Sequence, residues 1–259
     1  MPGPFADGPL REAMRHLFNS DPESGCAALA GYLDEFPDDP LAHALHGAVR
    51  FYHDVSLHIS RRDSKSIVGV LLGPGIAMPR ALQKEIGSDL RRARTLAAKL
   101  LATHAGDAGA LLALCVVEGV NRDGLALVSK RWSASIEHAQ RAYCFARRLL
   151  EHEPLAYDAH FVFGSTEYLV SRVPPPVRPF VDIPGVTGDR RKAIGYCQIA
   201  AKSGLYFREL ASRTLVNLYI EDDRPAEALS LLGELADEFP GNRTLRADWI
   251  GLQARARRK

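Results

Sequence analysis

The chain has 259 residues, with 33 lysines and arginines against 31 aspartates and glutamates, which gives a net charge of +2. A balance this even offers no concentrated basic surface of the kind that nucleic acids need. Hydrophobic residues make up 46% and charged residues 25%, a composition typical of a folded, soluble protein. The sequence has no apolar run of about 18 residues, so we expect no membrane-spanning helix.

Apolar residues recur at helical spacing through most of the chain, which predicts an all-α protein. The expected helices lie near residues 9–19, 23–36, 39–58, 80–103, 107–120, 132–152, 155–171, 189–203, 206–221, 225–238 and 242–255. They pair as 9–36, 39–103, 107–152, 155–203 and 206–238, followed by a terminal helix at 242–255. Because a lone helical pair cannot bury its apolar face, we expect a right-handed superhelical solenoid that forms a single domain over residues 1–259.

Internal repetition supports the solenoid. Residues 92–101 align with residues 141–150 at an offset of 49, which is 142 minus 93. The next predicted helices align at the same offset, with Glu118 over Glu167. Gly47 and Gly164 each follow a helix-ending proline by ten residues (37 to 47 and 154 to 164). We predict that these small residues allow the two helices of a pair to touch.

The C-terminal third carries the clearest repeat pattern. Its motifs are the stretches 188–193 and 203–208, Leu215 and Tyr219 on one helix, and the apolar stripe from Ala228 to Pro240 on the next. With these motifs the chain resembles the tetratricopeptide-repeat superfamily. It is also similar to bacterial repeat proteins related to the yeast inclusion-body clearance protein. The resemblance implies a protein-binding role, with neither a catalytic residue nor a cofactor.

The repeat is longer than usual, since an ordinary tetratricopeptide repeat has about 34 residues. We place the extra length between the two helices of a pair, at 59–79, 121–131 and 172–188. The first and third of these inserts are apolar, as at Leu71-Leu72 and Phe180-Val181. An alternative function is therefore peripheral association with a membrane through inserts 59–79 and 172–188.

The first helices of such pairs usually line a concave groove, where a protein or peptide partner binds. The residues expected to contact this partner are Phe161, Ser165, Tyr168, Arg213 and Asn217. Arg213 and Asn217 resemble two positions of the clamp with which some tetratricopeptide domains hold chaperone C-termini. Phe161 and Ser165 break that clamp pattern one repeat earlier, so we predict no chaperone-tail binding.

A second alternative is a metal-dependent enzyme, because His43, His46 and His53 lie within one arc of a predicted helix. A packing role is favoured, since His43 and His46 occupy positions that face the partner helix. The sequence has no HExxH or GxSxG motif. We therefore predict that the protein is not an enzyme and holds no metal or cofactor.

The four cysteines, Cys26, Cys115, Cys144 and Cys197, form no CxxC pair. Each lies in an apolar helical stretch, and we expect them to pack as small hydrophobic residues. Free thiols favour a reducing compartment such as the cytoplasm. Residues 1–4 lack the features of a signal peptide, and export stays open if such a segment was removed. The sequence identifies neither the partner nor the oligomeric state.

Overall fold

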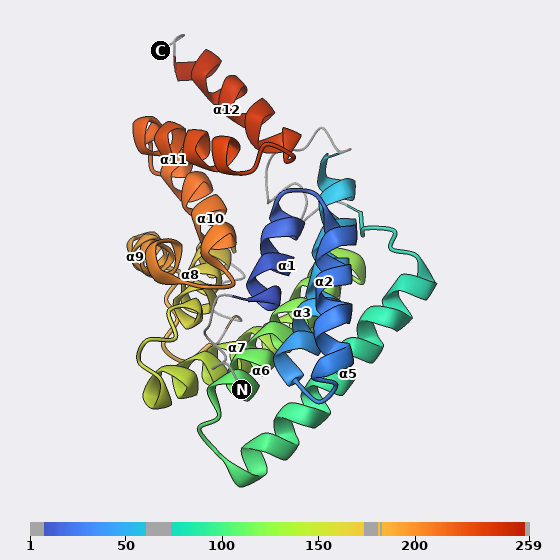
Figure 1. Ribbon diagram of the computed structural model, residues 1–259. Helices are drawn as coiled ribbons and strands as arrows, with labels where there is room; N and C mark the ends of the chain where they lie inside the picture. Colours follow the sequence, from blue (N-terminus) through green and yellow to red (C-terminus); the bar gives the residue numbers. More distant parts are fainter. Residues whose placement is uncertain (1–7, 61–73, 174–180, 182, 257–259) are drawn as a thin grey trace.

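The computed structural model describes residues 8–60, 74–173, 181 and 183–256. Within these ranges the protein consists of eleven α-helices and one π-helical turn, and no strand is formed. The helices are α1 (Pro9–Phe18), α2 (Pro22–Glu35), α3 (Pro40–Ser60), α5 (Arg80–Thr103), α6 (Ala108–Asp123), α7 (Trp132–His152), α8 (Asp158–Ser171), α9 (Arg190–Ser203), α10 (Arg208–Glu221), α11 (Pro225–Glu238) and α12 (Arg243–Ala256). The predicted all-α solenoid is confirmed, and Figure 1 shows its helices in sequence order.

Prolines and aspartates set the helix boundaries. α1, α2 and α11 carry proline in their first turn, where the missing N–H costs nothing. Asp21, Asp107 and Asp189 cap α2, α6 and α9 by accepting hydrogen bonds from backbone N–H groups of the first turn. These local signals explain why the helix positions follow from the sequence.

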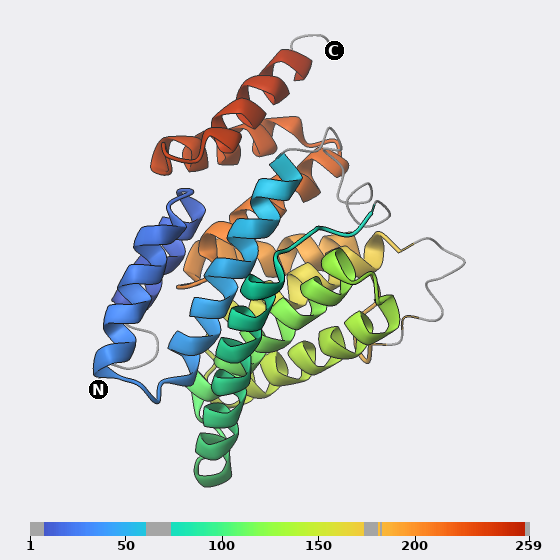
Figure 2. The ribbon, with the colours of Figure 1, turned by 90° about the vertical axis from the view of Figure 1, so that its right-hand side faces the viewer.

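Neighbouring helices pack in sequence order around two hydrophobic cores. The larger core extends from α1 to α8 and reaches Phe207, and the second is built mainly by α9 to α12. Figure 2 shows α1 and α2 in blue on one side of α3, with the green helices α6 and α7 on the other. Stacked helical pairs thus share continuous cores, as expected of a repeat array.

Small residues allow the helices of a pair to approach closely, as predicted. A Cβ added at Gly47 would lie 3.2 Å from Leu90 Cδ2 of α5. One added at Gly164 would lie 2.5 Å from Cys197 Sγ of α9. Cys115 takes the equivalent position on α6, 49 residues before Gly164, and its Sγ donates to the carbonyl oxygen of Ala142 at 3.8 Å.

The repeated glutamates are both buried but are held differently. Glu118 is 1% exposed and pairs with Arg94 at 2.8 Å, Arg141 at 3.0 Å and His138 at 2.6 Å. Glu167 is also 1% exposed. Its carboxylate accepts from the backbone N–H groups of Thr187 at 3.1 Å and Asp189 at 2.9 Å. Gly188 between them has φ 67°, a left-handed conformation that glycine adopts without strain.

Two predictions about local structure are wrong. Residues 121–131 were expected to be an insert, but α6 continues to Asp123 and a π-helical turn, η1, follows at Gly124–Val128. Its Ala126 is buried, so these residues extend the inner helix and contribute to packing. Cys144 is exposed, because α7 turns the stripe of Ala142, Ala146 and Leu149 toward the core instead.

Candidate interaction surface

The first helix of each pair lies on the inner side of the array, and α1 covers part of this side. α1 packs on α2 and α3 and also touches α10. A small cavity of about 40 Å³ lies between the inner helices. Among the residues that line it are Met14, Tyr52, Gly119, Phe161, Ser165 and Leu210. The central part of the concave face is therefore a nearly filled core.

Contacts between the two ends of the array hold α1 in place. The Phe18 ring meets the Phe239 ring edge-on, with centroids 4.9 Å apart. The Asn242 amide donates to the Phe18 carbonyl oxygen at 2.7 Å, and the Gly241 N–H donates to the Asn19 side-chain oxygen at 2.8 Å. Apolar packing and hydrogen bonds thus join the first helical pair to the turn between α11 and α12.

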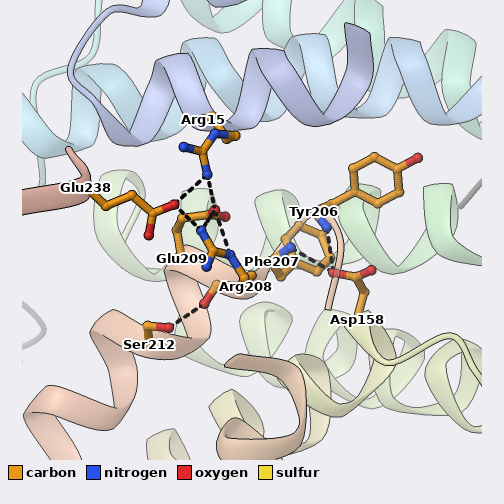
Figure 3. A network of polar contacts seen from close by, with 8 residues as sticks. All are labelled: Arg15, Asp158, Tyr206, Phe207, Arg208, Glu209, Ser212 and Glu238. Carbon is orange, nitrogen blue, oxygen red and sulfur yellow. Dashed lines mark hydrogen bonds and ion pairs between the residues drawn. The ribbon is translucent and has the colours of Figure 1, made fainter. Parts of the chain in front are cut away.

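A charged network strengthens the same junction, and Figure 3 shows it. Arg15 of α1 donates to Glu238 of α11 at 2.7 Å and lies 3.5 Å from Glu209 of α10. Arg208 binds both carboxylates. Burial alone would raise the pKa of Glu238, but hydrogen bonds from Arg15 and Arg208 outweigh it, and the pKa is lowered. Glu209 is only 3% exposed, so its carboxylate is buried against these two arginines.

Asp158 fixes the turn that leads into α10, as Figure 3 also shows. Its buried carboxylate accepts backbone hydrogen bonds from Leu205 at 3.0 Å, Tyr206 at 2.9 Å and Phe207 at 2.7 Å. Burial raises the pKa of Asp158, and the three N–H groups act against that rise. The turn places Phe207 against Phe161, with ring centroids 5.5 Å apart.

Of the three predicted contact residues on α8, two are buried and Phe161 is half-buried. Phe161 is half-buried against Phe207. Ser165 is buried, and its hydroxyl donates to the Val162 carbonyl oxygen at 3.2 Å. Tyr168 is buried, and its hydroxyl donates to Glu221 of α10 at 2.9 Å. In this arrangement their side chains pack the inner helices together.

The two predicted residues on α10 lie at the surface. Arg213 and Asn217 are half-exposed, and Arg213 forms an ion pair with Asp248 of α12 at 2.5 Å. They belong to a stripe, here called the α10 stripe, that follows one face of the helix at every third or fourth residue. Its members are Leu210, Arg213, Thr214, Asn217 and Ile220. The stripe becomes more open toward Ile220, which is 42% exposed.

Sequence reasoning missed Leu210 and Ile220. Both are apolar residues on a helix of the repeat, and such residues are normally assigned to the core. The signal that could have separated them is their helical register. Leu215, Leu218 and Tyr219 form the buried face of α10. Ile220 lies outside that face and in phase with Arg213 and Asn217.

No family model and no curated protein sequence matches this chain. A thermophilic TPR protein from Thermus thermophilus, known from a crystal structure, is similar in fold. The TM-score is 0.51 with 16% sequence identity, over 95% of this chain and 97% of that one. The chain has a tetratricopeptide-like fold.

In a tetratricopeptide-like array the outer side is formed by the second helices. Here a hollow of about 410 Å³ opens between α9 and α11 above α10. It is lined mainly by polar side chains, among them Gln198, Lys202, Ser212, Glu227 and Glu234. This hollow lies on the opposite face of α10 from the α10 stripe, so the two surfaces can be tested separately.

The histidines of α3 do not converge within the tetratricopeptide-like pair. His43 Nε2 lies 2.9 Å from the Pro37 carbonyl oxygen, and His46 Nδ1 lies 3.2 Å from Asp89 of α5. The packing prediction therefore holds for His46, whereas His43 contacts the turn before its own helix. Among the residues that the structure describes, no group of three or more His, Cys, Asp or Glu side chains could hold a metal ion.

The apolar inserts are only partly described. Leu71, Leu72 and Phe180 lie outside the described residues. At the described ends of the inserts, Ile76, Met78 and Ile183 are buried in the tetratricopeptide-like core. Within the described part of the chain, no helix is long and apolar enough to cross a membrane.

Proposed function

We propose that this protein is a non-enzymatic interaction scaffold that binds a protein or peptide along the α10 stripe. The observation that carries the proposal is the half-exposed row from Leu210 to Ile220 on an inner helix, next to the closed part of the concave face. Inner helices are the elements with which helical-repeat proteins usually hold extended or helical segments.

The stripe combines groups that suit such a partner. Ile220 offers an exposed apolar contact at one end, and Leu210 at the other end is half-buried beside the small cavity. Asn217 between them can both donate and accept hydrogen bonds to a peptide backbone. Arg213 is neutralised by Asp248, so a partner carboxylate would have to compete for it. We therefore expect a partner with apolar anchors and few charges, since anchors that fill apolar sites supply most of the binding energy.

The resemblance to bacterial repeat proteins related to the yeast inclusion-body clearance protein supports a protein partner. That relationship stays a prediction, and it rests on residues 188–240 of the sequence. Of the five contact residues expected from the sequence, we propose that Arg213 and Asn217 contact the partner directly. Phe161, Ser165 and Tyr168 would support the helix that lies behind them.

The test compares two exposed isoleucines on different faces. Ile220, which is 42% exposed, is replaced by aspartate, and Ile199 on α9, which is 39% exposed, receives the same change as a matched control. Partners captured from native lysate are quantified by mass spectrometry and then mapped by cross-linking. A partner that is lost with Ile220→Asp and kept with Ile199→Asp supports the α10 stripe.

Other outcomes would contradict the proposal. A partner lost only with Ile199→Asp would move binding to the outer face around the hollow between α9 and α11. A partner kept by both variants, with cross-links elsewhere, would remove the α10 stripe from consideration.

A further inference from the structure

Two arginines and a histidine from the outer helices meet at one buried carboxylate. Glu118 of α6 is 1% exposed. Its Oε1 atom lies 2.8 Å from Arg94 Nη2 of α5, and its Oε2 atom lies 3.0 Å from Arg141 Nε of α7. His138 Nδ1 of α7 lies 2.6 Å from the same Oε2 atom. Because both oxygens belong to one carboxylate, the two guanidinium groups are held next to each other.

These contacts leave positive charge and hydrogen-bond donors unused. Two arginines face one carboxylate, so the cluster has an excess of one positive charge even with a neutral His138. A guanidinium has about five N–H donors, and the contact with Glu118 uses one nitrogen of each arginine. Within the part of the chain that the structure describes, neither arginine forms another hydrogen bond or ion pair, and the exposed Glu137 of α7 does not pair with Arg141.

The arginines are open to solvent, whereas the carboxylate is not. Arg94 is 45% exposed and Arg141 is 44% exposed. The remaining nitrogens of each guanidinium are therefore available to a ligand. Because Glu118 already orders these two side chains, less free energy is lost to side-chain ordering when a ligand binds.

The equivalent glutamate of the next repeat shows that burial alone does not require the two arginines. Glu167 aligns with Glu118 at the offset of 49 and is equally buried. Its carboxylate accepts from two backbone N–H groups of the turn before α9. Tyr143 stands at the position of Arg94, and Arg190, at the position of Arg141, lies 3.9 Å from Glu221 instead. The arginine pair thus supplies more than a buried glutamate needs at this place in the repeat.

The helices that carry the pair are themselves basic. α5 contains six lysines and arginines against two acidic residues, and α7 contains three against two. The outer helices at the two ends differ, because α2 and α11 contain three and four acidic residues and no lysine or arginine. An anion is therefore attracted to the middle of the outer side, where the pair lies.

We propose that Arg94 and Arg141, positioned by Glu118, form a binding site for a dianionic phosphoryl group, either free phosphate or a phosphate monoester. Planar guanidinium groups match phosphate oxygens and donate charge-assisted hydrogen bonds to them. A dianion also balances the excess positive charge better than a single carboxylate does. The site lies on outer helices, away from the α10 stripe, so it stands or falls separately from the proposed scaffold function.

The test follows arginine modification in the full chain. The wild-type protein reacts with phenylglyoxal at neutral pH, and mass spectrometry gives the rate at each arginine in chloride, acetate, inorganic phosphate or O-phosphoserine of equal ionic strength. We expect phosphate or O-phosphoserine to slow the reaction of Arg94 and Arg141 by at least about threefold relative to chloride, and acetate to slow it less. Arg147, which is exposed on another face of α7, should not change. Stronger protection by O-phosphoserine than by phosphate would assign the site to a monoester, and the reverse to the free ion.

Two variants with the same loss of charge test the pair. In Arg141→Gln, phosphate should no longer protect Arg94, whereas in Arg147→Gln the protection should persist. Arg141→Lys, which keeps the charge but loses the planar fork, should weaken the protection and serves if Arg141→Gln does not fold. Equal protection of Arg147 in the wild-type protein would show a general ionic effect and overturn the proposal. Equal protection by acetate would overturn the phosphoryl assignment, and protection of Arg94 that persists in a folded Arg141→Gln protein would overturn the pair.

Discussion

The inner faces of α8 and α10 have equivalent places in neighbouring repeats, yet they have different surroundings. On α8, Ser165 and Tyr168 are buried within the closed part of the array. On α10, Arg213 and Asn217 are half-exposed beside α12. Tyr168 is covered by α10, whose Glu221 it binds, and Ser165 lines the small cavity together with Met14 of α1, whereas Arg213 faces α12, the last helix. A repeat therefore fixes which face of a helix points inward, while contacts between distant repeats decide whether that face is open.

The largest expected effect is a difference in the free energy of unfolding between substitutions on the inner face of α8 and on that of α10. Tyr168→Ala removes a buried ring and its hydrogen bond to Glu221, which should lower the free energy of unfolding by about 3–4 kcal/mol. Asn217→Ala should change it by no more than about 0.5 kcal/mol, because the side chain is at the surface. Urea denaturation followed by circular dichroism measures both. Similar losses for the two variants would contradict the assignment of a packing role to α8.

The next effect concerns the closure by α1. Phe18→Ala removes the aromatic contact with Phe239 and should cost about 2 kcal/mol, since the ring is only partly buried. Amide hydrogen exchange should then increase in α1 and on the inner side of α8. Unchanged exchange in α8 would show that its inner face does not depend on α1. Ile250→Ala on the exposed face of α12 serves as a control for loss of an apolar side chain.

Alanine substitutions at two glycines compare the stability effect of a methyl group at a packed and at an open position of the inner helices. Gly164→Ala places a methyl group 2.5 Å from Cys197 Sγ and 3.1 Å from the Cys197 nitrogen, which should cost about 1–3 kcal/mol. Gly119→Ala meets no atom within 4 Å and lines the small cavity, so it should stabilise α6 by up to about 1 kcal/mol. Thermal unfolding of both variants checks the opposite signs, and two destabilised proteins would indicate that the cavity is already full.

The smallest effect depends on pH. The pKa of Glu238 is lowered from its ordinary value of 4.5, so its contacts with Arg15 and Arg208 stabilise the fold above that pH and are lost as the pH falls. Glu238→Gln should cost about 0.5 kcal/mol at pH 7, because the pair is partly exposed to solvent. The difference from wild type should shrink as the pH falls below 4.5 and vanish once Glu238 is protonated in the folded protein. A difference that stays constant over this range would assign the loss to packing.

The sequence predicted the helices well because their signals are local. Proline and aspartate at helix starts, and apolar spacing within helices, act over a few residues, and α5, α7 and α11 begin and end where expected. Repetition likewise identified Gly164 as a close contact. The same logic could not predict the burial of Ser165 and Tyr168. Their exposure depends on residues far away in the chain.

The prediction of an insert at 121–131 was wrong for a related reason. Its polar start, Asn121 to Asp123, is typical of a loop, but Asp123 accepts a hydrogen bond from Tyr52 at 2.8 Å and an ion pair from Arg122 at 2.7 Å. The tertiary contact with Tyr52 and the local ion pair stabilise the last turn of α6. Polar residues were therefore compatible with a helix once partners from α3 were present.

The junction between α1 and α11 also has a consequence for how the protein unfolds. In an open repeat array every contact is local, so the ends fray independently and the middle can persist alone. Here Arg15 and Glu238 are in contact across 223 positions of the chain. Opening either end breaks the same junction, so we expect the first and last repeats to lose their structure together. The array should then unfold more cooperatively than its repeat architecture alone implies, and fold more slowly, because this contact closes a very long loop.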